Sequence, residues 1–297
     1  MSATDSGAAE FETHRRFLRS LAYRMLGSRA DAEDTVQDAW LRWHATERSA
    51  VDHPRAFLSQ MVTRLCLDRI KSAQAQREVY VGAWLPEPVV DDATEFQPGP
   101  ETLHELANDL SFAFMLTLER LSPLERAAFL LHDVFDMDYA DIAQTLGRSE
   151  SACRQLASRA RNNVHANRPA FRVSPEEGNR LADAFANAIR HGDVAGLAAV
   201  LARDATFVSD GGGRVTAVPR PVVGRDKVAQ VIIGFARLAK PGEVLVRRAQ
   251  VNGLAGFVMS GADGGLIQTL AIEPDGNGQI RAIYVVRNPE KLQAVKP

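Results

Sequence analysis

The stretch LSPLERAAFLLHDVFDMDYADIAQTLGRSESACRQLASRARNNVHAN, residues 121–167, decides the fold of the middle of this chain. The balance of charge along it changes sign at Gly147. Before that glycine, four aspartates stand against a single strong base, Arg126; after it, five arginines up to Arg168 face only Glu150. A basic helix that follows a tight glycine turn is typical of a helix-turn-helix, whose second helix enters the DNA major groove.

The residues around Gly147 support this prediction. The apolar face of the first helix is formed by Tyr139, Ile142, Ala143 and Leu146 at helical spacing. Gly147 suits a left-handed cap, and Ser149 suits the N-cap of the next helix. Ala152, Leu156 and Ala160 then face inward. The side chains left to contact bases and phosphates are Arg148, Ser149, Ser151, Arg154, Gln155, Ser158, Arg159 and Arg161. The alternative is an ordinary solvated helix whose arginines serve solubility.

Composition bounds the rest of the argument. A chain of 297 residues is long enough for two or three domains. Its formal net charge of -2 argues against a protein that coats nucleic acid by bulk electrostatics. The two cysteines, Cys66 and Cys153, suggest neither a disulfide framework nor a zinc site, so we expect a reducing cytoplasm and no metal or cofactor. Without an apolar run near 18 residues, no membrane span is expected.

Residues from Phe11 to Arg77 have a helical pattern throughout. One apolar stripe contains Phe17, Leu21, Met25 and Leu26, and Gly27 ends it. The next helix carries a row of carboxylates, Asp31, Asp34 and Asp38, beside Leu41; this row is either a wet face or a docking surface for a basic partner. A third helix opens at His53 and Pro54, and its excess of arginine and lysine suits a phosphate backbone.

Between Trp84 and Asp109 the chain changes character. Prolines interrupt it, and its acidic residues meet no lysine or arginine, which predicts an extended acidic linker. The linker is either a plain solvated tether or a strand that mimics nucleic acid or occupies a basic channel. A further helix is expected from Leu103 to Leu121.

Past Pro169 the pattern predicts an α+β domain. Two helices, EEGNRLADAFANAIRHGD and VAGLAAVLARD, come first. ATFVSD and RVTAV are predicted to form a hairpin around the turn at Gly211, Gly212 and Gly213. Another helix and alternating strands with glycine turns follow. The predicted fold is a cone whose curved antiparallel sheet encloses a pocket, with mostly aliphatic inward positions at Val244, Val246, Ile267, Thr269, Ile283 and Val285.

Taken together, the blocks resemble the extracytoplasmic-function group of bacterial RNA polymerase sigma factors. DAEDTVQDAWLRW resembles the helix that grips the clamp helices of the polymerase β′ subunit, and HPRAFLSQMVTRLCLDRIK resembles the part that melts and reads the minus-10 element. The helix-turn-helix resembles the reader of the minus-35 element. WLPEP, DGGGR and NPEKL are similar to motifs of the subgroup that carries a C-terminal SnoaL-like, NTF2-type domain, although Arg214 replaces an expected lysine.

The resemblance implies four segments: sigma region 2 at 8–80, the linker at 81–108, sigma region 4 at 109–168 and the SnoaL-like domain at 174–292. It implies polymerase contacts at Asp31, Asp34, Gln37, Asp38 and Leu41, and minus-10 contacts at Arg55, Arg64, Asp68, Arg69 and Lys71. The outward side chains of the helix-turn-helix become the minus-35 contacts. Regulatory contacts are implied at Trp84, Leu85, Pro86, Asp210, Gly211, Gly212, Gly213, Arg214, Asn288 and Pro289.

The expected function is promoter-directed initiation of transcription with core polymerase and promoter DNA as partners, modulated in cis by the C-terminal domain, whose pocket is a candidate small-molecule site. A one-component helix-turn-helix regulator with a ligand-binding tail is the alternative, but it leaves the first helical block without a role. Catalysis would need a buried acid or base in the pocket. The candidates, His191, Asp204, Asp226 and Asp263, lie mostly in turn-like or strand-entry sequence, so we do not expect an enzyme.

Overall fold

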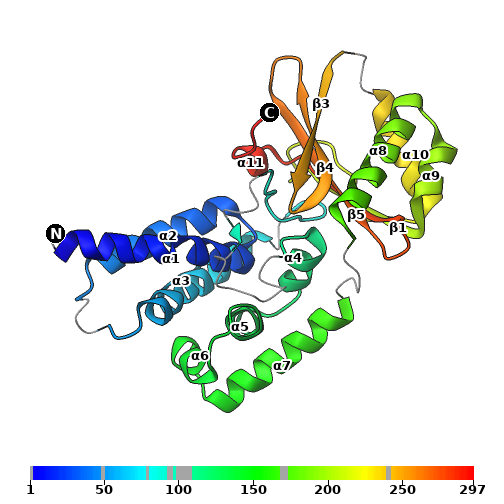
Figure 1. The fold of residues 1–297 in the computed structure, drawn as a ribbon. Coiled ribbons are helices and arrows are strands. Elements are labelled where there is room, and N and C mark those ends of the chain that lie inside the picture. Colours follow the sequence, from blue (N-terminus) through cyan, green and yellow to red (C-terminus); the bar gives the residue numbers. More distant parts are fainter. Residues whose placement is uncertain are drawn as a thin grey trace. The chain divides into compact units, whose positions relative to one another are not determined.

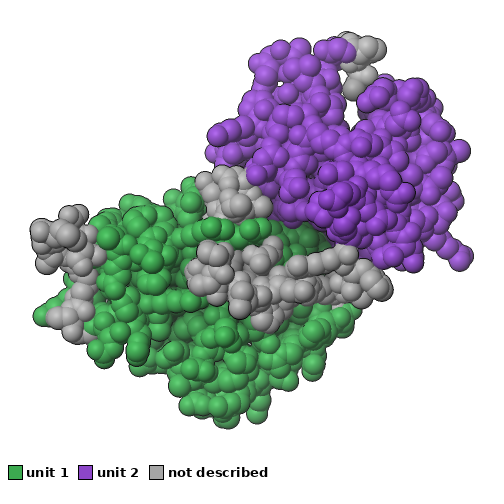
Figure 2. Space-filling view, in the orientation of Figure 1, with its two compact units in different colours: residues 1–78, 92–168 green, residues 79–91, 169–297 purple. Residues whose placement is uncertain are grey.

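The computed structural model describes residues 3–47, 51–77, 80–91, 96–97, 109–167, 173–238 and 242–297. The chain forms two compact units (Figure 2). Residues 1–78 and 92–168 make the first unit, and residues 79–91 and 169–297 make the second. The predicted linker is therefore divided: its first part belongs to the C-terminal unit. Most of 92–108 lies outside the described residues.

The first unit begins with three helices, α1 Ala3–Leu26, α2 Arg29–His44 and α3 Pro54–Arg77 (Figure 1). Gly27, at φ 70°, ends α1 in the left-handed region that glycine tolerates. Ser28 then caps α2 by accepting a hydrogen bond from the Asp31 amide. The predicted stripe at Phe17, Leu21, Met25 and Leu26 is buried, as are Val36, Ala39 and Trp43 of α2.

The unit continues with α4 Phe112–Glu119, α5 Pro123–Phe129, a π-helical turn η4 at Leu130–Val134, α6 Tyr139–Leu146 and α7 Glu150–Asn167. A helix was predicted from Leu103 to Leu121, but residues 109–111 are not helical and Ser111 caps the start of α4. The prediction was therefore wrong for residues 109–111. Residues 103–108 lie outside the described residues. Ser122 and Glu125 form a capping box that starts α5.

Two buried arginines tie α1 to later parts of the first unit. Arg126, on α5, donates to the Met25 carbonyl at the end of α1 and pairs with Glu119 at 2.7 Å. Arg24 donates to the Phe96 carbonyl at 2.9 Å, and its burial lowers its pKa to about 10. The rings of Phe17 and Phe135 meet edge to face at 5.0 Å. The helices of both predicted sigma regions thus share one core.

The second unit is a six-stranded sheet covered by helices. Its elements are α8 Pro175–His191, α9 Val194–Val200, β1 Leu201–Asp210, β2 Val222–Val223, α10 Arg225–Leu238, β3 Val244–Val251, β4 Leu254–Gly261, β5 Leu266–Pro274, β6 Ile280–Val286 and α11 Pro289–Leu292. The strand order is β2-β1-β6-β5-β4-β3. Side chains of α8, α9 and α10 form one core with β1, β4, β5 and β6, on the face that these helices cover in Figure 1.

The predicted fold class is confirmed, with three local corrections. The sheet is mixed, because β1 and β6 run parallel while the other neighbouring strands are antiparallel. The second predicted helix stops at Val200, and Leu201 already pairs with Ile280; this tertiary pairing overrides the helical propensity of the sequence LAR. RVTAV is not a strand, since the amides of Arg214 and Val215 both bond back to the Gly211 carbonyl. The short strand β2 pairs with β1 instead.

The predicted inward positions of the sheet were right in part. Ile283 and Val285 are buried in the core that faces the helices, and Val244, Ile267 and Val285 line a cavity of about 460 Å³ under the helices. Thr269 is buried on the opposite face of the sheet, because it pairs with Val258 and Val286, so its prediction as an inward residue was wrong. Val246 is 58% exposed, so its prediction as an inward residue was wrong. It lies on β3, the last strand in the order of the described sheet.

Candidate functional sites: a helix-turn-helix and a linker clasp

The helix-turn-helix is built as its sequence predicts. Gly147 adopts φ 61° and ψ 42°, which ends α6, and the Arg148 amide bonds to the Ala143 carbonyl. The Ser149 hydroxyl accepts a hydrogen bond from the Ala152 amide at 3.3 Å, which starts α7. Ile142 and Leu146 of α6 pack inward, and so do Leu156 and Ala160 of α7.

The outward side of α7 carries the predicted DNA-reading side chains. Arg148, Ser149, Ser151, Arg154, Gln155, Ser158 and Arg159 are all exposed. Arg154 pairs with Glu150 at 2.7 Å within the helix, and Arg159 pairs with Glu125 at 2.8 Å while its side chain stays 60% exposed. Exposed ion pairs of this kind contribute little to stability, so they do not prevent these arginines from contacting phosphate.

Arg161 differs from its neighbours. It is half-buried, and its guanidinium lies 2.6 Å from Asp133, which raises its pKa. A charge-assisted contact of this length holds the side chain against η4. The structure therefore brings Arg161 to the inner edge of the predicted DNA surface, where it fixes the position of α7.

The predicted polymerase-binding residues form one exposed face of α2. Asp31, Asp34, Gln37 and Leu41 are exposed, with Leu41 at 60%, and Asp38 is partly exposed. A large apolar side chain beside carboxylates is typical of a protein-binding surface.

The predicted minus-10 residues are only partly gathered into one surface. Arg69 lies against the carboxylates of α2, at 2.9 Å from Asp38 and 3.6 Å from Asp31. Arg64 donates to the Thr145 and Gln144 carbonyls at the end of α6, at 3.1 and 2.9 Å. Asp68 and Lys71 pair with each other on the exposed side of α3 at 3.5 Å. Arg55 lies 4.5 Å above the ring of Phe17.

The second site lies in the C-terminal unit, where residues 80–91 wrap onto the end of β1. We call the group Tyr80, Leu85, Asp210, Asn288 and Lys291 the linker clasp. Asp210 is fully buried. One carboxylate oxygen accepts from the Tyr80 hydroxyl at 2.5 Å and from the Gly212 amide at 3.0 Å; the other accepts from the Leu85 amide at 2.8 Å and from Lys291 at 2.7 Å. A buried carboxylate with four donors is fully satisfied.

The remaining residues of the clasp close around this carboxylate. The amides of Arg287 and Asn288 both donate to the Asp210 carbonyl, and the Asn288 side chain donates to Tyr80 at 3.2 Å. The Lys291 ammonium lies 4.5 Å from the ring of Trp84 and 5.0 Å from that of Tyr80. Burial and the hydrogen bond to Asp210 raise the pKa of Tyr80 above its usual range.

Three sequence motifs thus meet in one place. Trp84, Leu85 and Pro86 come from WLPEP, and Leu85 and Pro86 are buried. The glycine motif supplies the turn: Gly212 has φ 61°, and a Cβ there would lie 2.3 Å from the side-chain nitrogen Nδ2 of Asn288. Asn288 caps α11 and Pro289 opens it. Arg214 pairs with Glu290 at 2.9 Å on the exposed side.

Sequence reasoning missed two clasp residues, Tyr80 and Lys291. Lys291 belongs to the NPEKL motif, and it supplies the charge that a buried Asp210 requires. The need of a buried aspartate for a positively charged partner was the signal that could have pointed to Lys291. Nothing in the sequence pointed to Tyr80, which lies outside the WLPEP motif and is only near Trp84 in the chain.

The end of the same segment extends the edge of the sheet. Val90 forms an antiparallel bridge with Val251, and Asn252 exchanges hydrogen bonds with Val89 at 2.7 and 3.0 Å. Asp91 accepts from the Gln250 amide at 2.9 Å and pairs with Arg247. Of the alternatives for the linker, a plain solvated tether is therefore wrong for residues 80–91.

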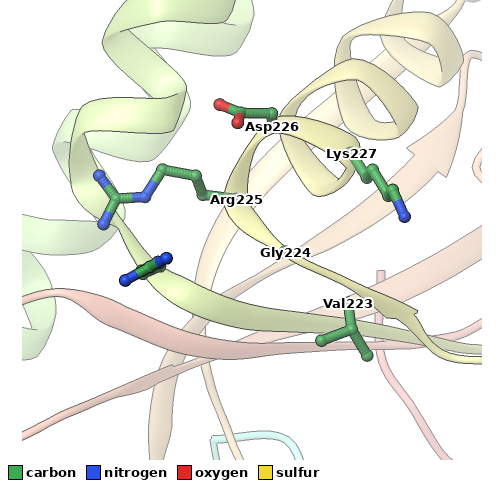
Figure 3. Close-up of a pocket in the computed structure, with 6 residues that line it drawn as sticks. Val223, Gly224, Arg225, Asp226 and Lys227 are labelled. Carbon is green, nitrogen blue, oxygen red and sulfur yellow. The ribbon is translucent and has the colours of Figure 1, made fainter.

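The four candidate catalytic residues do not come together. His191 and Asp263 bond to nearby backbone at 2.9 and 3.0 Å, and Asp204 is exposed. Asp226 lines a wide, open pocket at the start of α10 with Arg225 and Lys227, whose side chains point in different directions in Figure 3. The lining of the 460 Å³ cavity contains none of these four residues.

Among the helices that the structure describes, none is both long and apolar enough to cross a bilayer. In those same parts of the chain, no group of three or more His, Cys, Asp or Glu side chains is placed to hold a metal ion.

Comparison with known families defines the class of protein. Residues 11–76 match the family described as Sigma-70 region 2, and residues 111–164 match Sigma-70, region 4. The chain belongs to the extracytoplasmic-function RNA polymerase sigma factors, which confirms the resemblance seen in the sequence.

Relatives in this family match both units. The chain is 40% identical to the ECF RNA polymerase sigma factor SigJ of Mycobacterium tuberculosis, over 96% of this chain and 92% of that protein. It is 34% identical to the probable ECF sigma factor SigI of the same species, over 100% of this chain and 98% of that one. The crystal structure of M. tuberculosis SigJ superposes with a TM-score of 0.73 at 38% identity, covering 96% of this chain and 98% of the other.

Proposed function

We propose that this chain directs core RNA polymerase to promoters and starts transcription, and that its C-terminal unit modulates this activity through the linker clasp. Membership of the sigma-factor family carries the first part. The exposed face of α2, from Asp31 to Leu41, is the proposed polymerase surface. The outward side of α7 is the proposed minus-35 reader, and the basic side chains of α3 contact the minus-10 region.

Arg69 links the proposed polymerase surface on α2 to the proposed minus-10 surface on α3. It neutralises Asp31 and Asp38, which are proposed polymerase contacts, while being itself a proposed DNA contact. A phosphate and these carboxylates compete for the hydrogen-bond donors of one guanidinium. When polymerase binds the carboxylates of α2, Arg69 is therefore released to contact DNA. This exchange gives a physical reason why a weakly acidic protein binds a promoter productively only with polymerase.

The single observation that carries the regulatory part is the burial of Asp210 beneath residues 80–91. This segment connects, along the chain, the end of α3 to the residues that precede α4, so its attachment to the C-terminal unit restricts the path between the two proposed promoter-reading parts. Loss of the clasp frees that path. We propose that the cavity of the same unit holds a small-molecule ligand, and that the protein works in the cytoplasm without catalysing a reaction.

Run-off transcription from the DNA upstream of its own gene, with purified bacterial core polymerase, tests both parts. Initiation that depends on both proteins supports the sigma function, whereas tight promoter binding without polymerase and no initiation contradicts it in favour of a one-component regulator. Asp210→Asn is expected to change the yield of transcript roughly tenfold in either direction, since a hydrogen bond to a charged group contributes about 1.5–3 kcal/mol.

The matched control is Asp263→Asn, which alters an exposed carboxylate that caps its own turn far from the clasp in sequence. Transcription equal to that of the unchanged protein is expected for this control. Equal transcription from Asp210→Asn as well would contradict regulation through the clasp, while leaving the sigma function standing.

A further inference from the structure

The cavity of about 460 Å³ in the C-terminal unit has an arginine, Arg287, in an otherwise mostly apolar wall. Its lining is mostly apolar and includes Phe207, Ile232, Met259 and Leu270. Arg287, which follows the last residue of β6 and lies two residues beyond Val285, also lines the cavity. Cavities of this size and polarity hold small organic molecules, and the few polar groups in their walls set the class of ligand.

The guanidinium of Arg287 is only partly satisfied. One terminal nitrogen donates to the Thr216 carbonyl, while Nε is buried without a hydrogen-bond partner among the described residues. Burial lowers the pKa of Arg287, which reflects the loss of water around the cation. A partly desolvated guanidinium with unused donors is suited to a carboxylate, which it binds through paired hydrogen bonds.

The same residue is part of the framework of the clasp. The backbone amides of Arg287 and Asn288 both donate to the Asp210 carbonyl, at 2.7 and 3.0 Å. Along β1, Phe207 and Ser209 line the cavity, and Asp210 points to the opposite side of the sheet, where its carboxylate holds residues 80–91. Thr216, in the loop after the glycine turn, both lines the cavity and accepts from Arg287.

We propose that this cavity binds a small apolar molecule with a carboxylate, that Arg287 pairs with the carboxylate, and that binding loosens the linker clasp. The carboxylate competes with the Thr216 carbonyl for the guanidinium. Release of Thr216 frees the loop that begins at Gly211, and that loop supplies the Gly212 amide to Asp210. The ligand thereby becomes the signal for the regulation proposed above, and the inference rests on that proposed function.

The test uses the full chain and decanoate as the probe, with decan-1-ol as its uncharged counterpart, in isothermal titration calorimetry. Decanoate is expected to bind at least tenfold more tightly than decanol, and Arg287→Gln is expected to remove that preference, whereas Arg287→Lys restores part of it. Ala236→Phe narrows the cavity from α10 while keeping Arg287, and it is expected to weaken both probes. Equal affinity of the unchanged protein for decanoate and decanol would overturn the proposed site. Binding of decanoate that neither Arg287→Gln nor Ala236→Phe weakens would also overturn it.

Hydrogen exchange followed by mass spectrometry measures the coupling. Saturating decanoate is expected to raise amide exchange in residues 80–91 at least threefold and to leave α5 unchanged. Unchanged exchange in residues 80–91 with decanoate bound would overturn the coupling. These outcomes are separate from the proposed regulation, because Asp210→Asn still alters transcription without any ligand if only the ligand site is wrong.

Discussion

At the scale of single residues, the glycine turn beside the clasp makes a sharp prediction. Gly212→Ala is expected to lower the free energy of unfolding of the C-terminal unit by well over the ~1–2 kcal/mol that a left-handed residue costs, because the new methyl group also lies 2.3 Å from Asn288. Gly264→Ala is the matched control, since Gly264 has φ 80° and a methyl group added there would meet no other atom within 4 Å. Urea unfolding of both variants gives the comparison; equal losses would mean that the Asn288 contact yields without cost.

Two neighbouring arginines separate DNA reading from support. Arg159→Ala is expected to weaken promoter binding by the polymerase complex roughly tenfold, the ~1–3 kcal/mol of a lost arginine contact, and to lower the melting temperature less than Arg161→Ala does, because its contact with Glu125 is exposed. Arg161→Ala is expected to lower the melting temperature with little change in promoter binding, because the Arg161 side chain is held by Asp133. Filter binding and thermal unfolding decide between them. A loss of stability in Arg159→Ala equal to that in Arg161→Ala would contradict this division of roles.

At the scale of elements, the start of α5 should respond to acid. Hydrogen bonds from Arg159 and Ser122 lower the pKa of Glu125, so the folded state favours the ionised form. The resulting stability is present above the usual glutamate pKa near 4.3 and is lost as pH falls through the lower folded value. Glu125→Gln should therefore be less stable than the unchanged protein at pH 7 and converge with it below about pH 4. Melting temperatures measured from pH 7 to pH 3 test this, and a constant gap would exclude the carboxylate as its cause.

At the scale of the whole molecule, Arg64 has two roles in the first unit. It is a proposed minus-10 contact, and it now joins α3 to the last carbonyls of α6. Arg64→Ala is expected to cost about 1–2 kcal/mol of stability through these hydrogen bonds, and to reduce the salt dependence of promoter binding by about one unit of slope. Arg64→Lys keeps the charge without the fork of donors, so it should restore the slope but not the stability. An unchanged slope in Arg64→Ala would remove Arg64 from the proposed DNA contacts.

Much of this protein followed from sequence alone, wherever the cause is local. The caps at Gly147 and Ser149 and the apolar stripes of α1 and α6 depend on residues within a few positions of one another, so their pattern is legible in the chain. The order of the blocks was enough to identify the family. The residues implied for regulation were also found by their motifs, although nothing local says that they meet.

Tertiary structure decided what depends on residues far apart in the chain. The strand at Leu201 exists because Ile280 pairs with it, and RVTAV fails to form a strand because β2 pairs with β1 in its place. Tyr80 and Lys291 became visible as partners only when Asp210, more than 80 residues from either, was found buried between them. The physical reason is that a buried charge must be satisfied by whichever donors folding brings to it, and sequence distance places no limit on that choice.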